Sequence, residues 1–118
     1  MILHITSRVE WKDAQLQGEY IAPSLEAEGF IHCSTEKQVA YVANAFYRGR
    51  KDLVLLNIDE TKLNSELKWE APAGPPASGI SESDLFPHIF GAINLNAVAS
   101  VLDLVPDSVS GIFSYPNH

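Results

Sequence analysis

Three histidines, His4, His32 and His88, lie among large apolar residues and are the first candidates for chemistry. A buried polar group without a partner costs about 1–3 kcal/mol, so each imidazole needs a local partner or a ligand. Thr6 and Ser34 each follow a histidine by two residues, and residues two apart on a strand share a face. An imidazole beside a hydroxyl suits the recognition of ribose or phosphate. These pairs therefore indicate a site for a small-molecule ligand.

His88 stands on a stiff stretch of backbone. It follows Pro87, whose ring fixes its own φ and pushes Phe86 toward an extended conformation. Rigid support is what a binding site needs, and it favours ligand-binding roles for Phe86 and His88. We predict that residues 29–34 and 86–91 together form a polar pocket.

Glu70 is a further candidate, because it directly precedes a loop rich in Pro and Gly at residues 71–84. Long loops are often functional lids, and catalytic groups are common beside them. Structural explanations stay open for all these residues. Glu70 can be an ordinary exposed acid and His4 a solvent-facing strand residue. His32 can bind a backbone carbonyl, and Ser34 can cap the helix that follows it.

Cys33 and a metal site are weaker alternatives. Neighbours on a strand face opposite ways, so Cys33 is expected in the core and not paired with His32 as a nucleophile. His4, His32 and His88 could in principle hold zinc with three imidazoles. No closely spaced ligand pair such as His-x-His or His-x-x-x-His occurs in the sequence, so we expect no metal.

Two capping boxes mark the main helices. Ser7 with Glu10, and Thr35 with Gln38, have the spacing at which a helix N-terminus is closed by side chains. An apolar stripe follows each pair, and a single helical turn is expected over residues 24–28. The run 52–59 has a wholly apolar centre, which suits a strand covered on both faces.

Several short strands with two main helices predict an α+β fold with a small split or strongly twisted mixed sheet. With 118 residues, the chain is the size of one domain, 1–118. The expected strands span residues 2–6, 20–22, 30–33, 52–59, 67–70, 98–105 and 112–115.

Charge and composition limit the partners. Eight basic and fifteen acidic residues give a net charge of −7, which disfavours a nucleic-acid backbone as partner. One cysteine excludes an intrachain disulfide and fits a reducing compartment. The sequence shows neither a signal peptide nor a long apolar run, so we expect a cytoplasmic protein that does not span a membrane. Oligomeric state is not predicted.

Several motifs together resemble the bacterial DUF952 family, a domain of unknown function, and the resemblance covers nearly the whole chain. The strings around His32 and His88 are its most specific parts. The matching segments are Leu3-His4-Ile5-Thr6, Glu10-Trp11, Glu28-Gly29-Phe30-Ile31-His32-Cys33-Ser34, Lys68-Trp69-Glu70 and Phe86-Pro87-His88-Ile89-Phe90-Gly91.

The resemblance implies an ADP-ribosyltransferase-like fold, in which a split sheet grips NAD as the substrate. His4 would then hold ribose hydroxyls, and His32 with Ser34 would fix the nicotinamide ribose. Glu70, matched by its order along the chain, would stabilise positive charge at the sugar carbon. His32 stands where many members have a tyrosine, and His88 has no counterpart.

Three hypotheses follow. An NAD-dependent transferase requires His4, His32 and Glu70 to converge on one cleft. A non-catalytic nucleotide or small-ligand binding module requires the cleft without a positioned acid. A structural or interaction protein requires histidines that are satisfied in the core, with no cavity beside His32.

Overall fold

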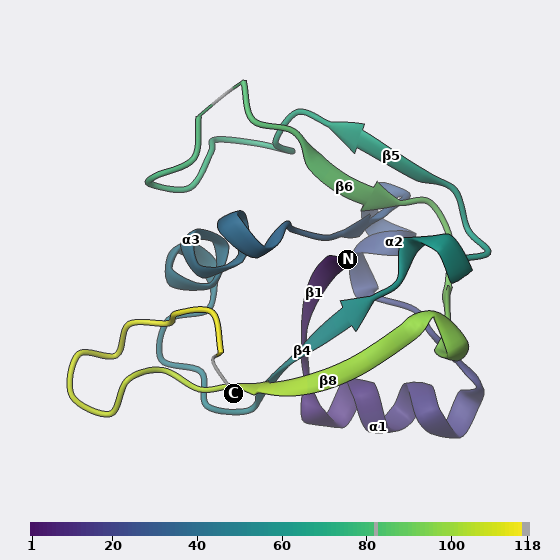
Figure 1. The fold of residues 1–118 in the computed structure, drawn as a ribbon, viewed down its shortest axis with the longest axis horizontal. Helices are drawn as coiled ribbons and strands as arrows, with labels where there is room; N and C mark the ends of the chain where they lie inside the picture. Colours follow the sequence, from purple (N-terminus) through teal and green to yellow (C-terminus); the bar gives the residue numbers. More distant parts are fainter. Residues whose placement is uncertain (82, 117–118) are drawn as a thin grey trace.

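The computed structural model describes residues 1–81 and 83–116. The three-stranded sheet with the longer strands has the order β1-β4-β8, and both of its pairings are antiparallel. Strand β1 (Ile2–Ser7) lies at one edge and β8 (Val98–Leu104) at the other, with β4 (Leu53–Ile58) between them. Figure 1 shows this sheet across the lower part of the molecule, with α1 beneath it.

Strand β4 is buried on both faces, which confirms the prediction from its apolar run. Val54 and Leu56 belong to a core that includes Ala14 of α1. Leu53 and Leu55 alternate with them and belong to a second core, which includes residues of α3. Every residue of this strand therefore packs inside the protein, except Asn57, which is half-buried.

The predicted capping residues begin the two longer helices. Helix α1 (Arg8–Gln17) starts after Ser7, whose Oγ accepts a hydrogen bond from the Glu10 amide at 3.0 Å. Helix α3 (Glu36–Phe46) starts after Thr35, and both halves of its capping box are present. The turn expected at residues 24–28 is the short helix α2 (Pro23–Glu28).

A second three-stranded sheet has the order β3-β6-β5 and lies across the upper part of Figure 1. It consists of β3 (Ile31–His32), β6 (Phe86–Ile89) and β5 (Leu67–Glu70). One backbone pair joins it to β1: Leu3 and Ser34 each donate an amide hydrogen to the other's carbonyl, both at 2.8 Å. The sheets diverge beyond this pair, in keeping with the split sheet that the sequence predicts.

Short elements complete the described chain. Strands β2 (Glu19–Tyr20) and β7 (Ile93–Asn94) form an antiparallel pair. Single 3-10 turns lie between the longer strands: η1 (Glu60–Lys62) between β4 and β5, and η2 (Leu95–Ala97) directly before β8. Among the described residues, no helix has both the length and the apolar character needed to cross a bilayer.

Four expectations about strands were wrong. The strand expected at residues 20–22 lies instead at Glu19–Tyr20. Residues 112–115 form no strand, because Phe113 is buried and its backbone is bound by the amide of Asn44. The strand expected at residues 30–33 is reduced to Ile31–His32. The pairings between named strands are all antiparallel and not mixed, within the part of the chain that the structure describes.

Candidate functional site

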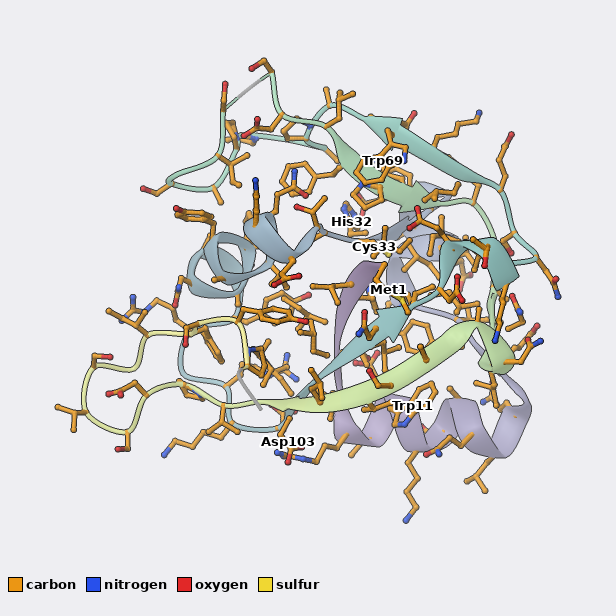
Figure 2. All side chains as sticks on the ribbon, viewed as in Figure 1. Met1, Trp11, His32, Cys33, Trp69 and Asp103 are labelled. Atoms are coloured by element: carbon orange, nitrogen blue, oxygen red, sulfur yellow. The ribbon has the colours of Figure 1, made fainter. Side chains whose placement is uncertain are left out.

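A cavity of about 450 Å³ lies where the two three-stranded sheets diverge, within the size range of small-molecule sites. Figure 2 shows His32 and Cys33 between the β5–β6 hairpin and β1. The cavity is also lined by Pro and Ala residues of the loop 72–77 and by residues of α3. The predicted site residues on its wall are His4, Thr6, His32, Ser34, Phe86 and His88. Glu70 is not among the described residues that line it.

His4 is buried and engages both ring nitrogens inside the protein. Its Nδ1 donates to the His32 carbonyl oxygen at 2.5 Å, and its Nε2 lies 2.8 Å from the Tyr20 hydroxyl. The Tyr20 hydroxyl lies 3.0 Å from Thr6 Oγ1, which lies 3.3 Å from a Glu10 carboxylate oxygen. The structure therefore leaves neither ring nitrogen of His4 available for ribose, and the solvent-facing alternative for His4 was wrong.

Burial lowers the pKa of His4 to about 4, against the opposing effects of its bond to the His32 carbonyl and the charge on Glu10. The neutral ring carries its hydrogen on Nδ1, because a carbonyl only accepts. Its bare Nε2 must then accept from Tyr20, whose one hydroxyl hydrogen can serve Nε2 or Thr6 but not both. A proton added to this chain of hydrogen bonds would satisfy both contacts at once, while burial of the charge opposes it.

His32 and His88 lie directly opposite each other on β3 and β6. Their ring centroids are 5.6 Å apart, with the planes at 72°. The ring of His88 is buried and stacks on Phe30 at 4.2 Å and 22°. These two histidines are thus neighbours in space, although they lie 56 residues apart in the chain (88 − 32).

Each of these imidazoles is bound by a carboxylate. Glu28 Oε2 lies 2.9 Å from Nε2 of His32, and Glu70 Oε1 lies 2.8 Å from Nδ1 of His88. Glu70 therefore contacts His88 and is set back from the cavity wall. Among the described residues, His4 and His32 line the cavity but Glu70 does not, so the three do not meet on one cleft.

Ser34 offers an unoccupied hydroxyl to the cavity. Thr35 caps α3, so the explanation of Ser34 as the helix cap was wrong. Its backbone is fixed by Leu3, but its Oγ has no protein partner within residues 1–81 and 83–116. That oxygen is not sealed from solvent, because Asn57 Oδ1 is the one side-chain polar atom of the described chain that is both sealed and unpartnered.

Arg50, the one arginine or lysine among the described lining residues, is already paired. Arg50 donates two hydrogen bonds to Asp52, at 2.9 and 2.7 Å, and the guanidinium lowers the pKa of that exposed carboxyl. Lysine is absent from the described lining. A phosphate in this cavity would therefore compete with Asp52 for the Arg50 guanidinium.

Most of the lining residues were not indicated as site residues by the sequence, and Glu10, Tyr20 and Arg50 are the ones that matter most for hydrogen bonding and charge. Glu10 was recognised as a capping residue, and its position one turn after Thr6 could have suggested a second role. Tyr20 and Arg50 carry no local signal, because the chain brings them to the wall from β2 and from the loop before β4.

Two alternatives weighed for this region do not fit the structure. Cys33 is buried in the core, as expected, and burial raises the pKa of its thiol. His4, His32 and His88 do not converge as metal ligands. Within residues 1–81 and 83–116, no group of three or more His, Cys, Asp or Glu side chains is placed to hold a metal ion.

The fold and site define a class of small α+β domains with antiparallel sheets and a cavity where two of them diverge. Residues 5–101 match the family model described as Protein of unknown function (DUF952). The chain belongs to this family.

Solved structures of Protein CC0527 from Caulobacter crescentus are similar to the chain throughout. One crystal structure has a TM-score of 0.80 and 33% identity, covering 96% of this chain and 92% of that one. A double mutant of the same protein gives a TM-score of 0.79 at 32% identity, with the same coverage. The solution NMR structure has a TM-score of 0.74 and 34% identity, covering 94% of this chain and 89% of that one. No curated protein matches the chain.

Proposed function

We propose that this protein binds a nucleotide-type small molecule in the cavity between β1 and the β3–β6 pair. The observation that carries the proposal is the convergence of six predicted residues on one cavity of about 450 Å³. Among them, the Ser34 hydroxyl and the His88 imidazole match the hydrogen-bonding groups of a sugar, while Phe86 supplies an aromatic surface. NAD is the first candidate, because the family resemblance implies an ADP-ribosyltransferase-like site.

The charges of the wall favour the sugar and base of such a ligand over its phosphates. Arg50 is neutralised by Asp52, and His32 and His88 each contact a carboxylate. We therefore place the ribose and heteroaromatic ring inside the cavity, with any diphosphate toward solvent. Nicotinamide riboside should bind about as well as NAD if this placement holds.

Catalysis is the second candidate, and Glu10 is the observation that favours it. Its carboxylate lies at the cavity wall, held by Thr6 and by a bond of 3.0 Å from the Ser7 hydroxyl. A carboxylate there could stabilise the positive charge that develops on a ribosyl carbon as nicotinamide leaves. Glu70 does not reach the wall, so Glu10 would replace it in that role.

Thermal unfolding with added ligand tests the binding. A ligand at about 100 times its Kd stabilises the native state by about 2.7 kcal/mol, which is roughly 10 °C for a domain of this size. NAD, ADP-ribose, nicotinamide riboside and ribose 5-phosphate are the probes. A flat response to all four would contradict the proposal.

Ser34→Ala checks the position of the bound ligand. The loss of one hydrogen bond of about 1 kcal/mol should weaken binding roughly fivefold, with little effect on stability because the Oγ has no protein partner in the described chain. Ser100→Ala, an exposed change on β8, is the matched control. Release of free nicotinamide from NAD separates the two candidates, because a binding protein without catalysis releases none.

A further inference from the structure

The pair formed by His88 and Glu70 has a geometry that simple ligand binding does not need. Glu70 Oε1 holds Nδ1 of His88 at 2.8 Å, and the stacked ring of Phe30 covers one face of the imidazole. His88 is 3% exposed, so packing and the hydrogen bond together fix its ring. An imidazole held in this way keeps one tautomer and one orientation.

The other ring nitrogen of His88 is available to a ligand. Nε2 has no protein partner among the described residues, yet it is not sealed from solvent, unlike Asn57 Oδ1. His88 is also one of the residues that line the cavity. A carboxylate on Nδ1 with a free Nε2 facing a cavity is the arrangement of a general base.

We infer that His88 is an acid–base residue of the cavity and that Glu70 is its positioning residue. A ligand hydroxyl or a water within hydrogen-bond reach of Nε2 would give up its proton there. The O–H bond breaks, its electron pair stays on oxygen, and the N–H bond formed leaves an imidazolium facing the Glu70 carboxylate. The same Nε2 then returns the proton to a departing oxygen.

The neighbouring histidines lack this combination. Both ring nitrogens of His4 are engaged by protein groups. His32 has a carboxylate on Nε2, but its side chain is 43% exposed, so its orientation is less restricted. His88 alone, among the histidines of residues 1–81 and 83–116, joins a buried ring, a carboxylate on one nitrogen and a cavity on the other.

This inference rests on the cavity of the proposed function but not on the identity of its ligand. The first test is the ¹⁵N spectrum of the histidine rings in the intact protein, with His88 assigned by the loss of its signals in His88→Gln. In the neutral form we expect the hydrogen on Nδ1 and a bare Nε2. A hydrogen found mainly on Nε2 would overturn the assignment of a base.

Glu70→Gln should shift the tautomer of His88, because an amide can either accept from Nδ1 or donate to it. Glu66→Gln is the matched control, since Glu66 lies just before the same strand and pairs with Lys68 at 3.7 Å. The control should leave the His88 spectrum unchanged. An unchanged spectrum in the folded Glu70→Gln variant would remove the positioning role.

The second test is acylation by diethyl pyrocarbonate, read by peptide mass spectrometry. The reagent attacks a neutral, accessible imidazole nitrogen, so His88 should be labelled in the folded protein while His4 is not. Glu70→Gln should slow labelling of His88 about tenfold, as expected for loss of a carboxylate that orients and polarises an imidazole. Labelling of His32 without His88 would show that Nε2 does not face open space.

Added NAD distinguishes this inference from the proposed function. Protection of His88 by NAD would support both. Labelling that NAD does not slow would contradict NAD binding in this cavity and would leave the assignment of His88 standing. Wild-type labelling decides the inference even if Glu70→Gln fails to fold.

Discussion

His4 should make the stability of this protein fall steeply below neutral pH. Its native pKa of about 4 lies below the ordinary value of 6.5, because burial disfavours the charged ring. Between these two values the unfolded chain binds a proton that the native state does not. Above about pH 6.5 His4 is neutral in both states and does not lower the free energy of unfolding. That free energy then falls as the pH drops from about 6.5 toward 4.

The magnitude follows from the pKa difference. A displacement from 6.5 to about 4 corresponds to about 3 kcal/mol of unfolding free energy, at about 1.4 kcal/mol per pKa unit. Small domains have about 5–15 kcal/mol in total, so this loss is a large fraction. With a urea m-value of about 1.5 kcal/mol per molar, the unfolding midpoint should drop by about 2 M.

Urea unfolding followed by far-UV circular dichroism, between about pH 7 and pH 4, measures this effect. His4→Gln replaces the titrating ring by a neutral group that can still reach Tyr20, so its stability should lack about 3 kcal/mol of the wild-type pH dependence. His32→Gln is the control, because it changes a half-exposed imidazole and leaves His4 in place. Equal pH dependence in wild type and His4→Gln would refute the reasoning.

Other substitutions test the packing around the cavity and the two ends of α3. Gly79→Ala should cost about 1 kcal/mol more than Gly74→Ala in urea unfolding: both have positive φ, but a Cβ at Gly79 would lie 2.4 Å from ring atoms of Tyr41, while Gly74 has open space; equal losses would contradict this contact. Asn44→Ala should cost about 2 kcal/mol, because it removes bonds of 2.9 and 2.8 Å to the backbone of buried Phe113, and Asn44→Asp should keep the one that the amide oxygen accepts. Thr35→Ala should lower Tm through a cap worth about 1 kcal/mol, and Thr35→Ser should restore it; no difference between these two would contradict the capping role.

Local patterns predicted the elements whose stability comes from nearby residues. Helices begin after Ser7 and Thr35, as their spacing with Glu10 and Gln38 predicts, because residues three apart meet at a helix N-terminus. The apolar run at the centre of β4 indicated burial on both faces, and two separate cores cover it. Such signals need no knowledge of the rest of the chain.

The wrong strand at residues 112–115 shows where local pattern fails. The sequence there suits an edge strand, but Asn44 of α3 binds both backbone groups of Phe113 and takes the place of a partner strand. That contact spans 69 residues. The residue pattern of a segment does not reveal whether its backbone will be bound by a strand or by a distant side chain.

The gathering of the predicted residues around one cavity was foreseen better than their hydrogen-bond partners. Six of the residues expected in the pocket line it, since polar groups inside apolar strings must find partners. The partners themselves came from elsewhere: Tyr20 reaches His4 from β2, and Glu70 reaches His88 across paired strands. Register between strands decides such contacts, and one sequence does not specify it.

The three histidines look alike in the sequence, and their hydrogen bonds make them different. A ring with both nitrogens bound inside the protein can affect a ligand only through the fold, so His4 should govern stability and its pH dependence. A ring with one nitrogen held and the other facing a cavity can exchange a proton with a ligand, so His88 should govern chemistry. His4→Gln should therefore change the unfolding midpoint without changing the tautomer of His88 in the folded protein, and Glu70→Gln should change that tautomer without removing the acid sensitivity that His4 confers. If one substitution moved both readouts, the two imidazoles would be coupled through the His32 segment that lies between them.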